Sequence, residues 1–171
     1  MKKVLLAFAI FTMIGLSANA QSIVKLDPLS LAFGSLRAGY ETFTSDKASV
    51  YAGLSYVNRG ILGIDYTGVG VFGQYRFYLS NTEAPKGIFA GPHLGVNFIG
   101  FDDGFGDRLN YTLVRIGGII GYQGIIGDNF TWEIGIGPTY GIISGDFSDD
   151  DDLFGTGIVP VSTLALGYRI N

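Results

Sequence analysis

Residues Phe130 to Ile142 read FTWEIGIGPTYGI, and their side chains alternate strictly between two kinds. Every second residue from Phe130 onward is apolar, and the residues between are glycine, threonine or glutamate. Because successive side chains of a β-strand point to opposite faces, this alternation predicts a strand with one apolar and one small or polar face. Its aromatic residues lie towards the two ends of the apolar face, where the girdle of a membrane barrel would place them.

The same two-residue period recurs along most of the chain. Closed outer-membrane barrels have an even number of antiparallel strands, so we expect eight here. Asp27-Pro28 interrupts the first of them, since proline is tolerated only at edges or bulges of a sheet, and a tight bend is expected at Phe33-Gly34. The sequence thus predicts an all-β, eight-stranded antiparallel up-and-down transmembrane β-barrel. The other expected strands are Ser22–Leu31, Gly34–Phe43, Lys47–Asn58, Val69–Leu79, Ile88–Phe101, Leu109–Ile125 and Thr163–Ile170.

Connections of two kinds alternate between these strands. With both termini in the periplasm, the longer and more acidic connections are expected outside the cell. Carboxylates gathered there could bind Ca²⁺, but the spacing of an EF-hand is missing, and a solvated loop is the preferred interpretation. The expected periplasmic turns are Thr44–Asp46, Asn81–Lys86 and Gly127–Asn129, and the expected outer loops are Arg59–Gly63, Asp102–Arg108 and Ser144–Thr156. The carboxylates in question are Asp102, Asp103, Asp107, Asp146 and Asp149 to Asp152.

The amino-terminal end has the three parts of a secretory signal peptide. Lys2 and Lys3 precede an apolar run, and Ala18-Asn19-Ala20 is a typical cleavage site. The run is too short to span a bilayer as a helix, which takes about 20 apolar residues. We therefore expect residues 1–20 to be removed and residues 21–171 to form one outer-membrane β-barrel domain. The chain has no cysteine that could carry a lipid anchor.

Composition agrees with an all-β chain and excludes one class of partner. Glycine accounts for 27 of the 171 residues and aromatics for 14%, which disfavours helix and favours strand. Without Lys2 and Lys3, nine basic residues face fifteen acidic ones, which argues against a nucleic-acid partner.

The polar face of the strands decides which side of the barrel wall meets water. A soluble lipocalin-like barrel, the alternative, buries its apolar face around a ligand and carries charged side chains outside. Here the polar face is too poor in charge for a water-exposed surface, because most of it is glycine, serine and threonine. Such small residues suit the narrow interior of an eight-stranded barrel, which leaves no channel of porin size. The glycines on this face are Gly39, Gly53, Gly70, Gly91, Gly95, Gly117, Gly121, Gly135, Gly137 and Gly167.

Two local patterns could point to chemistry. Gly68–Gly73 reads GVGVFG and matches the dinucleotide-binding string, but that string must open a helix after a strand, and this one lies within a strand pattern. His93, the only histidine, shares the inward face with Asn97 and could belong to a Ser–His–acid site of a membrane-embedded lipid-modifying enzyme. No G-x-S-x-G string marks a nucleophile, so a hydrogen-bonded interior histidine is preferred.

Charged residues on the inward face form the most informative set. Unpaired charges in a narrow interior are costly, so we expect salt bridges that plug the lumen, with a proton or ion path as the alternative. Glu41 and Glu133 are the only inward carboxylates by this parity, and each should accept hydrogen bonds from a guanidinium, with Arg76 or Arg169 favoured. The expected structural set is Arg37, Glu41, Arg76, Arg115, Glu133 and Arg169.

Several segments together resemble an uncharacterised family of Gram-negative outer-membrane β-barrel proteins, classed as a domain of unknown function. They are KLDPLSL at Lys25–Leu31, GYE at Gly39–Glu41, QYRFYLS at Gln74–Ser80, APKG at Ala84–Gly87 with Gly91-Pro92, GIIGYQ at Gly118–Gln123, GIGP at Gly135–Pro138 and GYR at Gly167–Arg169. The resemblance implies an OmpX/OmpA-like eight-stranded barrel and brings no catalytic residues. The C-terminus, with Leu164, Leu166, Tyr168 and Ile170, is also similar to the signal read by the outer-membrane insertion machinery.

Taken together, the sequence indicates a small outer-membrane barrel with a plugged polar lumen and a structural or surface-interaction role. We expect no catalysis, no cofactor and no metal site. The expected partners are outer-membrane lipid and, during assembly, the insertion machinery, while any partner of the outer loops stays open.

Overall fold

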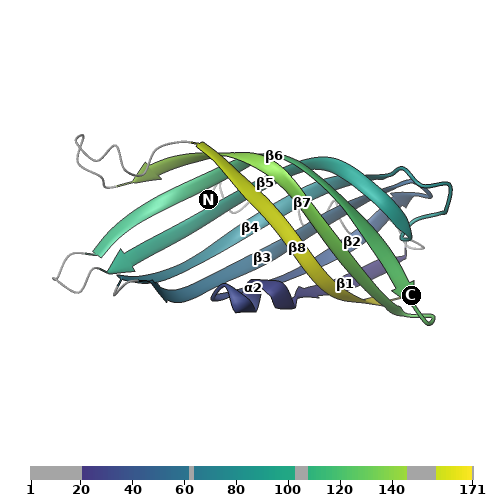
Figure 1. Cartoon of the computed structure of the whole chain (residues 1–171), viewed down its shortest axis with the longest axis horizontal. Helices are drawn as coiled ribbons and strands as arrows, with labels where there is room; N and C mark the ends of the chain where they lie inside the picture. Colours follow the sequence, from purple (N-terminus) through teal and green to yellow (C-terminus); the bar gives the residue numbers. More distant parts are fainter. Residues whose placement is uncertain (1–20, 62–63, 103–107, 146–156, 171) are drawn as a thin grey trace, which may run out of the picture.

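The computed structural model of the protein is a closed barrel of eight antiparallel strands, each paired with its sequence neighbours and the first with the last (Figure 1). The structure describes residues 21–61, 64–102, 108–145 and 157–170. The predicted eight-stranded antiparallel up-and-down barrel is therefore confirmed. The strands are β1 Ser22–Asp27, β2 Ser35–Ser45, β3 Ala48–Ile61, β4 Ile64–Tyr78, β5 Gly87–Asp102, β6 Arg108–Ile126, β7 Phe130–Gly145 and β8 Gly157–Ile170.

The first strand is shorter than the expected Ser22–Leu31. It ends at Asp27, and Pro28–Ala32 form a short helix, α2. Asp27 caps this helix, since its carboxylate accepts a hydrogen bond from the Ser30 N–H at 3.1 Å, and Pro28 occupies the first turn, where no N–H is needed. Gly34, with a φ of 66°, then turns the chain into β2 as expected for the bend at Phe33-Gly34.

Because β1 is short, it pairs only with the C-terminal part of β8. Ser22 to Leu26 pair with Ile170 to Leu166, and among the described residues no strand pairs with Gly157 to Ala165 on this side of β8. Helix α2 contacts β2 and β8 here instead, as Figure 1 shows. Arg37 of β2 also reaches across and donates a hydrogen bond from Nη1 to the Ser162 carbonyl at 2.9 Å. We call this place, where α2 and Arg37 replace a strand, the β8 seam.

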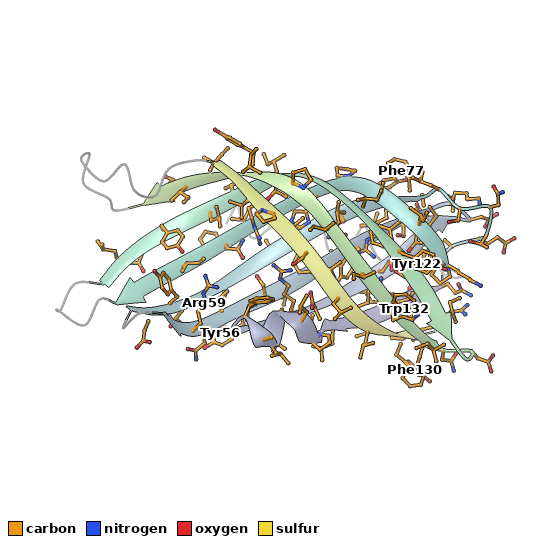
Figure 2. All side chains as sticks on the ribbon, in the orientation of Figure 1. Tyr56, Arg59, Phe77, Tyr122, Phe130 and Trp132 are labelled. Atoms are coloured by element: carbon orange, nitrogen blue, oxygen red, sulfur yellow. The ribbon has the colours of Figure 1, made fainter. Side chains whose placement is uncertain are left out.

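The two faces of the wall differ as the sequence predicts. Along β7 the alternation is complete from Ile134 to Ile142, with the isoleucines and Tyr140 exposed on the outside while the glycines and Thr139 face inward. Large apolar side chains on every strand point outward in the same way. Figure 2 shows Phe77, Tyr122, Phe130 and Trp132 projecting near the end of the barrel where β6 and β7 are joined. Tyr122 and Trp132 pack there with ring centroids 5.7 Å apart.

The two ends of the barrel carry the two sets of connections. The turns after β2, β4 and β6 lie at one end, at residues 46–47, 79–86 and 127–129. Three parts of the sequence-based interpretation fall outside the described residues: the predicted signal peptide at 1–20, the loop carboxylates at 103, 107, 146 and 149–152, and parts of the predicted outer loops at 62–63, 103–107 and 146–156. In the part of the chain that is described, no helix is long and apolar enough to cross a membrane.

Candidate functional site

Four buried charged side chains meet inside the barrel, near the end that carries the short turns. Lys25 of β1, Glu41 of β2, Arg76 of β4 and Glu133 of β7 form this ion cluster, and each is at most 1% exposed. Arg76 donates two hydrogen bonds to Glu133, of 2.7 and 3.0 Å, and lies 3.5 Å from Glu41. The Lys25 ammonium contacts both carboxylates, at 2.5 Å from Glu41 Oε2. Two positive and two negative groups leave the ion cluster neutral.

Uncharged polar side chains supply further hydrogen bonds around the ion cluster. Ser49 and Tyr78 donate to Glu41 at 2.5 and 3.0 Å, and Thr163 donates to Glu133 at 3.1 Å. Gln123 accepts from Lys25 at 2.6 Å. A buried ion pair offsets its desolvation cost only with such additional bonds, so these bonds help to stabilise the four buried charges.

Two aromatic rings pack against the Arg76 guanidinium. Tyr51 of β3 and Phe89 of β5 lie 4.3 and 4.4 Å from the Arg76 Cζ atom at their ring centroids, within the range of cation–π contacts. Glycine makes room for both rings. A Cβ on Gly39 would lie 2.6 Å from the Tyr51 ring, and one on Gly121 would lie 2.5 Å from the Phe89 ring. The inward glycines therefore leave space for large side chains from neighbouring strands.

The sequence-based set of inward charges divides into three groups in the structure. Glu41, Arg76 and Glu133 come together in the ion cluster. Arg169 does not join them, because its Nη1 donates to the Asp128 carbonyl at 3.1 Å in the β6–β7 turn. Arg37 and Arg115 line a separate cavity further along the lumen. Arg76 is thus the guanidinium that meets both glutamates.

Two members of the interior were missed. Lys25 lies at the centre of the ion cluster, and Asp27 is a third inward carboxylate, 3% exposed, so the expectation that only Glu41 and Glu133 point inward was wrong. The alternation of side chains along β1 would have indicated both residues, since Ile23, Lys25 and Asp27 alternate with the exposed Val24 and Leu26. The interruption at Pro28 hid this short strand.

A small cavity, which we call the arginine cavity, is lined in part by Tyr51, whose ring also packs on Arg76. It is lined among others by Asp27, Arg37, Gln74, His93, Arg115 and Ser162, and its volume is about 10 Å³, room for one water-sized sphere. The Asp27 carboxylate lies 3.8 Å from Arg37 Nη1. Among the described residues, no carboxylate forms a salt bridge with Arg115.

His93 is buried on the inward face, as expected, at 4% exposure. Its Nδ1 lies 3.2 Å from the Gln74 amide nitrogen, and its ring stacks on Phe72 with centroids 6.3 Å apart. In the described part of the chain, neither a serine hydroxyl nor a carboxylate is hydrogen-bonded to this ring. The arrangement is that of a packed interior histidine, without the nucleophile and orienting acid that a hydrolytic triad needs.

The sequence matches no protein-family model and no curated protein. The interpretation therefore depends on the geometry of the interior. Gly68–Gly73 lies wholly within β4, so the glycine string does not open a helix as dinucleotide binding requires. The described residues contain no group of three or more histidine and acidic side chains that could hold a metal ion. What the geometry provides is a neutral ion cluster that fills the lumen near the end with the short turns and connects β1, β2, β4 and β7.

Proposed function

We propose that the protein is an integral outer-membrane barrel of a Gram-negative bacterium with a structural or surface-interaction role and no catalytic activity. The observation that carries this proposal is the distribution of side chains across the wall: exposed apolar residues cover the outside, and the interior holds charges. Leu54, Ile136 and Leu166 are 66%, 61% and 57% exposed, while Arg76 and Glu41 are fully buried. An apolar surface on every strand is stable in hydrocarbon and unfavourable in water.

The same distribution argues against a soluble ligand-binding barrel. Such a barrel needs an apolar interior for its ligand and a charged exterior for solubility. This interior contains Lys25, Arg76 and two glutamates, and the small arginine cavity is polar. In a soluble barrel of this kind, the apolar side chains of every strand would have to face the interior and the polar ones the outside.

Closure of the lumen supports a role other than transport. Tyr51 and Phe89 pack on Arg76 of the ion cluster inside the barrel, and none of these three residues is more than 3% exposed. A diffusion channel needs a continuous aqueous path, which eight strands filled in this way do not provide. The proposed partners are therefore outer-membrane lipid around the wall and the insertion machinery during assembly, which would read the alternating C-terminal strand β8. Membership of the uncharacterised outer-membrane family that the sequence resembles is part of the same proposal.

Cell fractionation of a Gram-negative host that produces the full chain tests the proposal. We expect the protein in the outer-membrane fraction, and we expect its electrophoretic mobility in SDS to change on boiling, because pairing of the first strand with the last closes the barrel and leaves little free sheet edge. A protease site inserted within residues 146–156 should be cut on intact cells. Recovery of folded protein in the periplasmic fraction would contradict the membrane location. Cleavage only after the outer membrane is permeabilised would reverse the proposed orientation.

A further inference from the structure

A groove on the outside of the barrel wall lies near the end opposite to the short turns. Its volume is about 480 Å³, within the range of about 300–1,000 Å³ that is usual for ligand pockets. Tyr56, Val69 and Phe98 line it from β3, β4 and β5; they are cross-strand neighbours and are 44%, 57% and 55% exposed. Figure 2 shows Tyr56 towards this end, far from Phe130 and Trp132. We call this site the outer groove, and its lining also includes Thr67, Gly100, Asn110 and Thr112.

Gly100 forms part of the floor of the outer groove. It shares the outward face of β5 with Phe98, two residues away, and it is nevertheless buried. Thr67 of β4 and Asn110 of β6 are its cross-strand partners, so their side chains flank it on both sides. Because glycine has no side chain, the space between these two polar residues stays open.

The polarity of the wall changes at the level of the outer groove. Along β4 the outward-facing residues are Val71, Val69, Thr67 and Asp65, in order from the middle of the barrel to its end. Asp65 is exposed. A phospholipid shows the same order, with an apolar chain, an uncharged ester linkage and a charged head group. The outer groove thus lies at the depth where a lipid changes from chain to head group.

Polar side chains of the outer groove are free to bond a ligand. Within the described part of the chain, the side chains of Thr67, Asn110 and Thr112 have no hydrogen-bond partner. Both threonines are half-buried on a wall whose other outward residues are mostly apolar. Polar groups in such surroundings are costly unless they are hydrogen-bonded. The ester carbonyl oxygens of a lipid accept hydrogen bonds from hydroxyl and amide groups at this level.

We propose that the outer groove binds one molecule of a zwitterionic aminophospholipid, phosphatidylethanolamine in chemical class. This inference rests on the proposed function, which places this wall in the outer membrane. An acyl chain packs beside Val69 and Phe98, and Thr67 and Asn110 bond the ester linkage. The ammonium group of the lipid lies towards the exposed carboxylate of Asp65.

Charge decides between this lipid and an anionic one. Among the described residues that line the outer groove, none carries a charge. Arg59 is near this end of the barrel, but its guanidinium lies over the ring of Tyr66, 5.7 Å from the centroid, and neither residue lines the groove. A head group with a net negative charge would therefore find no cation in the groove and would meet Asp65. Complementary charge favours an ammonium there.

Native mass spectrometry of the folded full chain, released from uncharged detergent micelles, tests the site. Phosphatidylethanolamine, phosphatidylglycerol with the same acyl chains, and lipid A are titrated separately. We expect one phosphatidylethanolamine to bind along a saturable curve and phosphatidylglycerol to bind several-fold more weakly, as loss of an exposed charge pair implies. Asp65→Asn should abolish this preference. Equal binding of the two phospholipids to the wild type, or tighter binding of lipid A, would overturn the proposal.

Matched variants locate the bound lipid. Gly100→Leu fills the floor of the groove, and the double variant Thr67→Val with Asn110→Leu removes its hydrogen-bond donors. We expect roughly tenfold weaker binding in the double variant, as the loss of hydrogen bonds implies, and at least as large an effect in Gly100→Leu. Gly73→Leu, on the outward face of β4 where a Cβ would meet nothing within 4 Å, should bind like the wild type. A change of mobility on boiling verifies that each variant is folded.

Other outcomes would assign the groove differently. Equal lipid binding by Gly100→Leu and Gly73→Leu would overturn the proposed site. A wild-type dimer in micelles that Gly100→Leu dissociates would give the groove to a second copy of the chain and would also overturn the proposal. Absence of saturable lipid binding in a barrel that is recovered from the outer membrane would refute this inference alone, whereas folded protein in the periplasm would refute the proposed function itself.

Discussion

Arg76 and Glu133 face each other across the inside of the barrel and are joined by two parallel hydrogen bonds, of 2.7 and 3.0 Å. Arg76 lies on β4 and Glu133 on β7, so the pair connects strands that are not neighbours in the wall. Both side chains are almost completely buried. A planar guanidinium that binds a carboxylate in this way fixes distance and orientation together, and it makes the interior a rigid part of the fold.

Glu133→Ala should strongly destabilise the barrel. It removes an acceptor for Arg76, Lys25 and Thr163, and it leaves two buried cations to share Glu41. Breaking a buried pair in this way typically costs about 3–5 kcal/mol in the free energy of unfolding. Glu133→Gln keeps the shape and loses the charge, so it should lie between the alanine variant and the wild type. Urea unfolding in phospholipid vesicles measures all three.

The control for this series is Asp128→Ala in the exposed β6–β7 turn, which should stay within about 1 kcal/mol of the wild type. Equal stability of Glu133→Ala and Asp128→Ala would mean that water replaces the carboxylate. The argument that the ion cluster closes the lumen would then fail as well.

Lys25 and Glu41 should show a compensating effect. Lys25→Met leaves Glu41 and Glu133 as two carboxylates beside the single Arg76 guanidinium, and we expect a loss of about 3–5 kcal/mol. Adding Glu41→Gln restores a neutral ion cluster with one arginine and one glutamate. The double variant should therefore be more stable than Lys25→Met alone. Adding Asp128→Asn to Lys25→Met, as the matched control, should restore nothing. An additive loss in the double variant would contradict the coupling.

The sequence predicts the strands well because the period of two reports directly on which side of the wall a side chain faces. From Phe130 to Ile142 this pattern is uninterrupted, and β7 follows it closely. The first hairpin behaves differently, because local capping competes with the strand. Asp27 and Pro28 together favour a helix start, and the hydrogen bonds from Ser30 to Asp27 accompany the end of β1 after six residues.

Which inward charges pair is a harder question for sequence reasoning than which charges point inward. The two-residue alternation shows on which face of the wall a side chain lies. It does not show the position of that side chain along the barrel axis or its distance from the opposite wall. Arg169 and Arg76 share the inward parity, yet Arg169 reaches the Asp128 carbonyl at the rim while Arg76 reaches Glu133. Lys25 contacts Glu133, 108 residues away, only because the barrel closes between β1 and β8.

Purified barrel in planar lipid bilayers should show no conductance steps of porin size. The ion cluster and the rings of Tyr51 and Phe89 fill the interior, and the adjoining arginine cavity holds about 10 Å³. A porin with 16 to 18 strands, which leaves an aqueous channel, serves as the positive control. Stepwise conductance of similar size from the wild-type protein would contradict the closed interior and, with it, the proposed role.

Arg37→Met should loosen the β8 seam without unfolding the barrel. In a strand, every second residue points its main-chain N–H and C=O groups to the same neighbouring strand, and the Arg169 N–H donates to the Asn129 carbonyl on the β7 side. Even-numbered residues of β8 therefore present their N–H and C=O groups to β1 at residues 166–170 and to the β8 seam at residues 157–165. Pro160 has no N–H that could stay unpaired there. Arg37 donates a hydrogen bond to the Ser162 carbonyl at 2.9 Å.

Hydrogen exchange followed by mass spectrometry measures this effect. A hydrogen bond from a charged group contributes about 1.5–3 kcal/mol when buried, and Arg37 is 22% exposed, so we expect the lower end of that range and exchange roughly tenfold faster. The change should be confined to residues 157–165, whereas residues 166–170, which pair with β1, should exchange as in the wild type. Arg59→Met, which removes an exposed arginine of β3, is the matched control and should leave both segments unchanged. Unaltered exchange at 157–165 in Arg37→Met would show that α2 alone closes the seam, and faster exchange at 166–170 would show that the whole β1–β8 junction depends on Arg37.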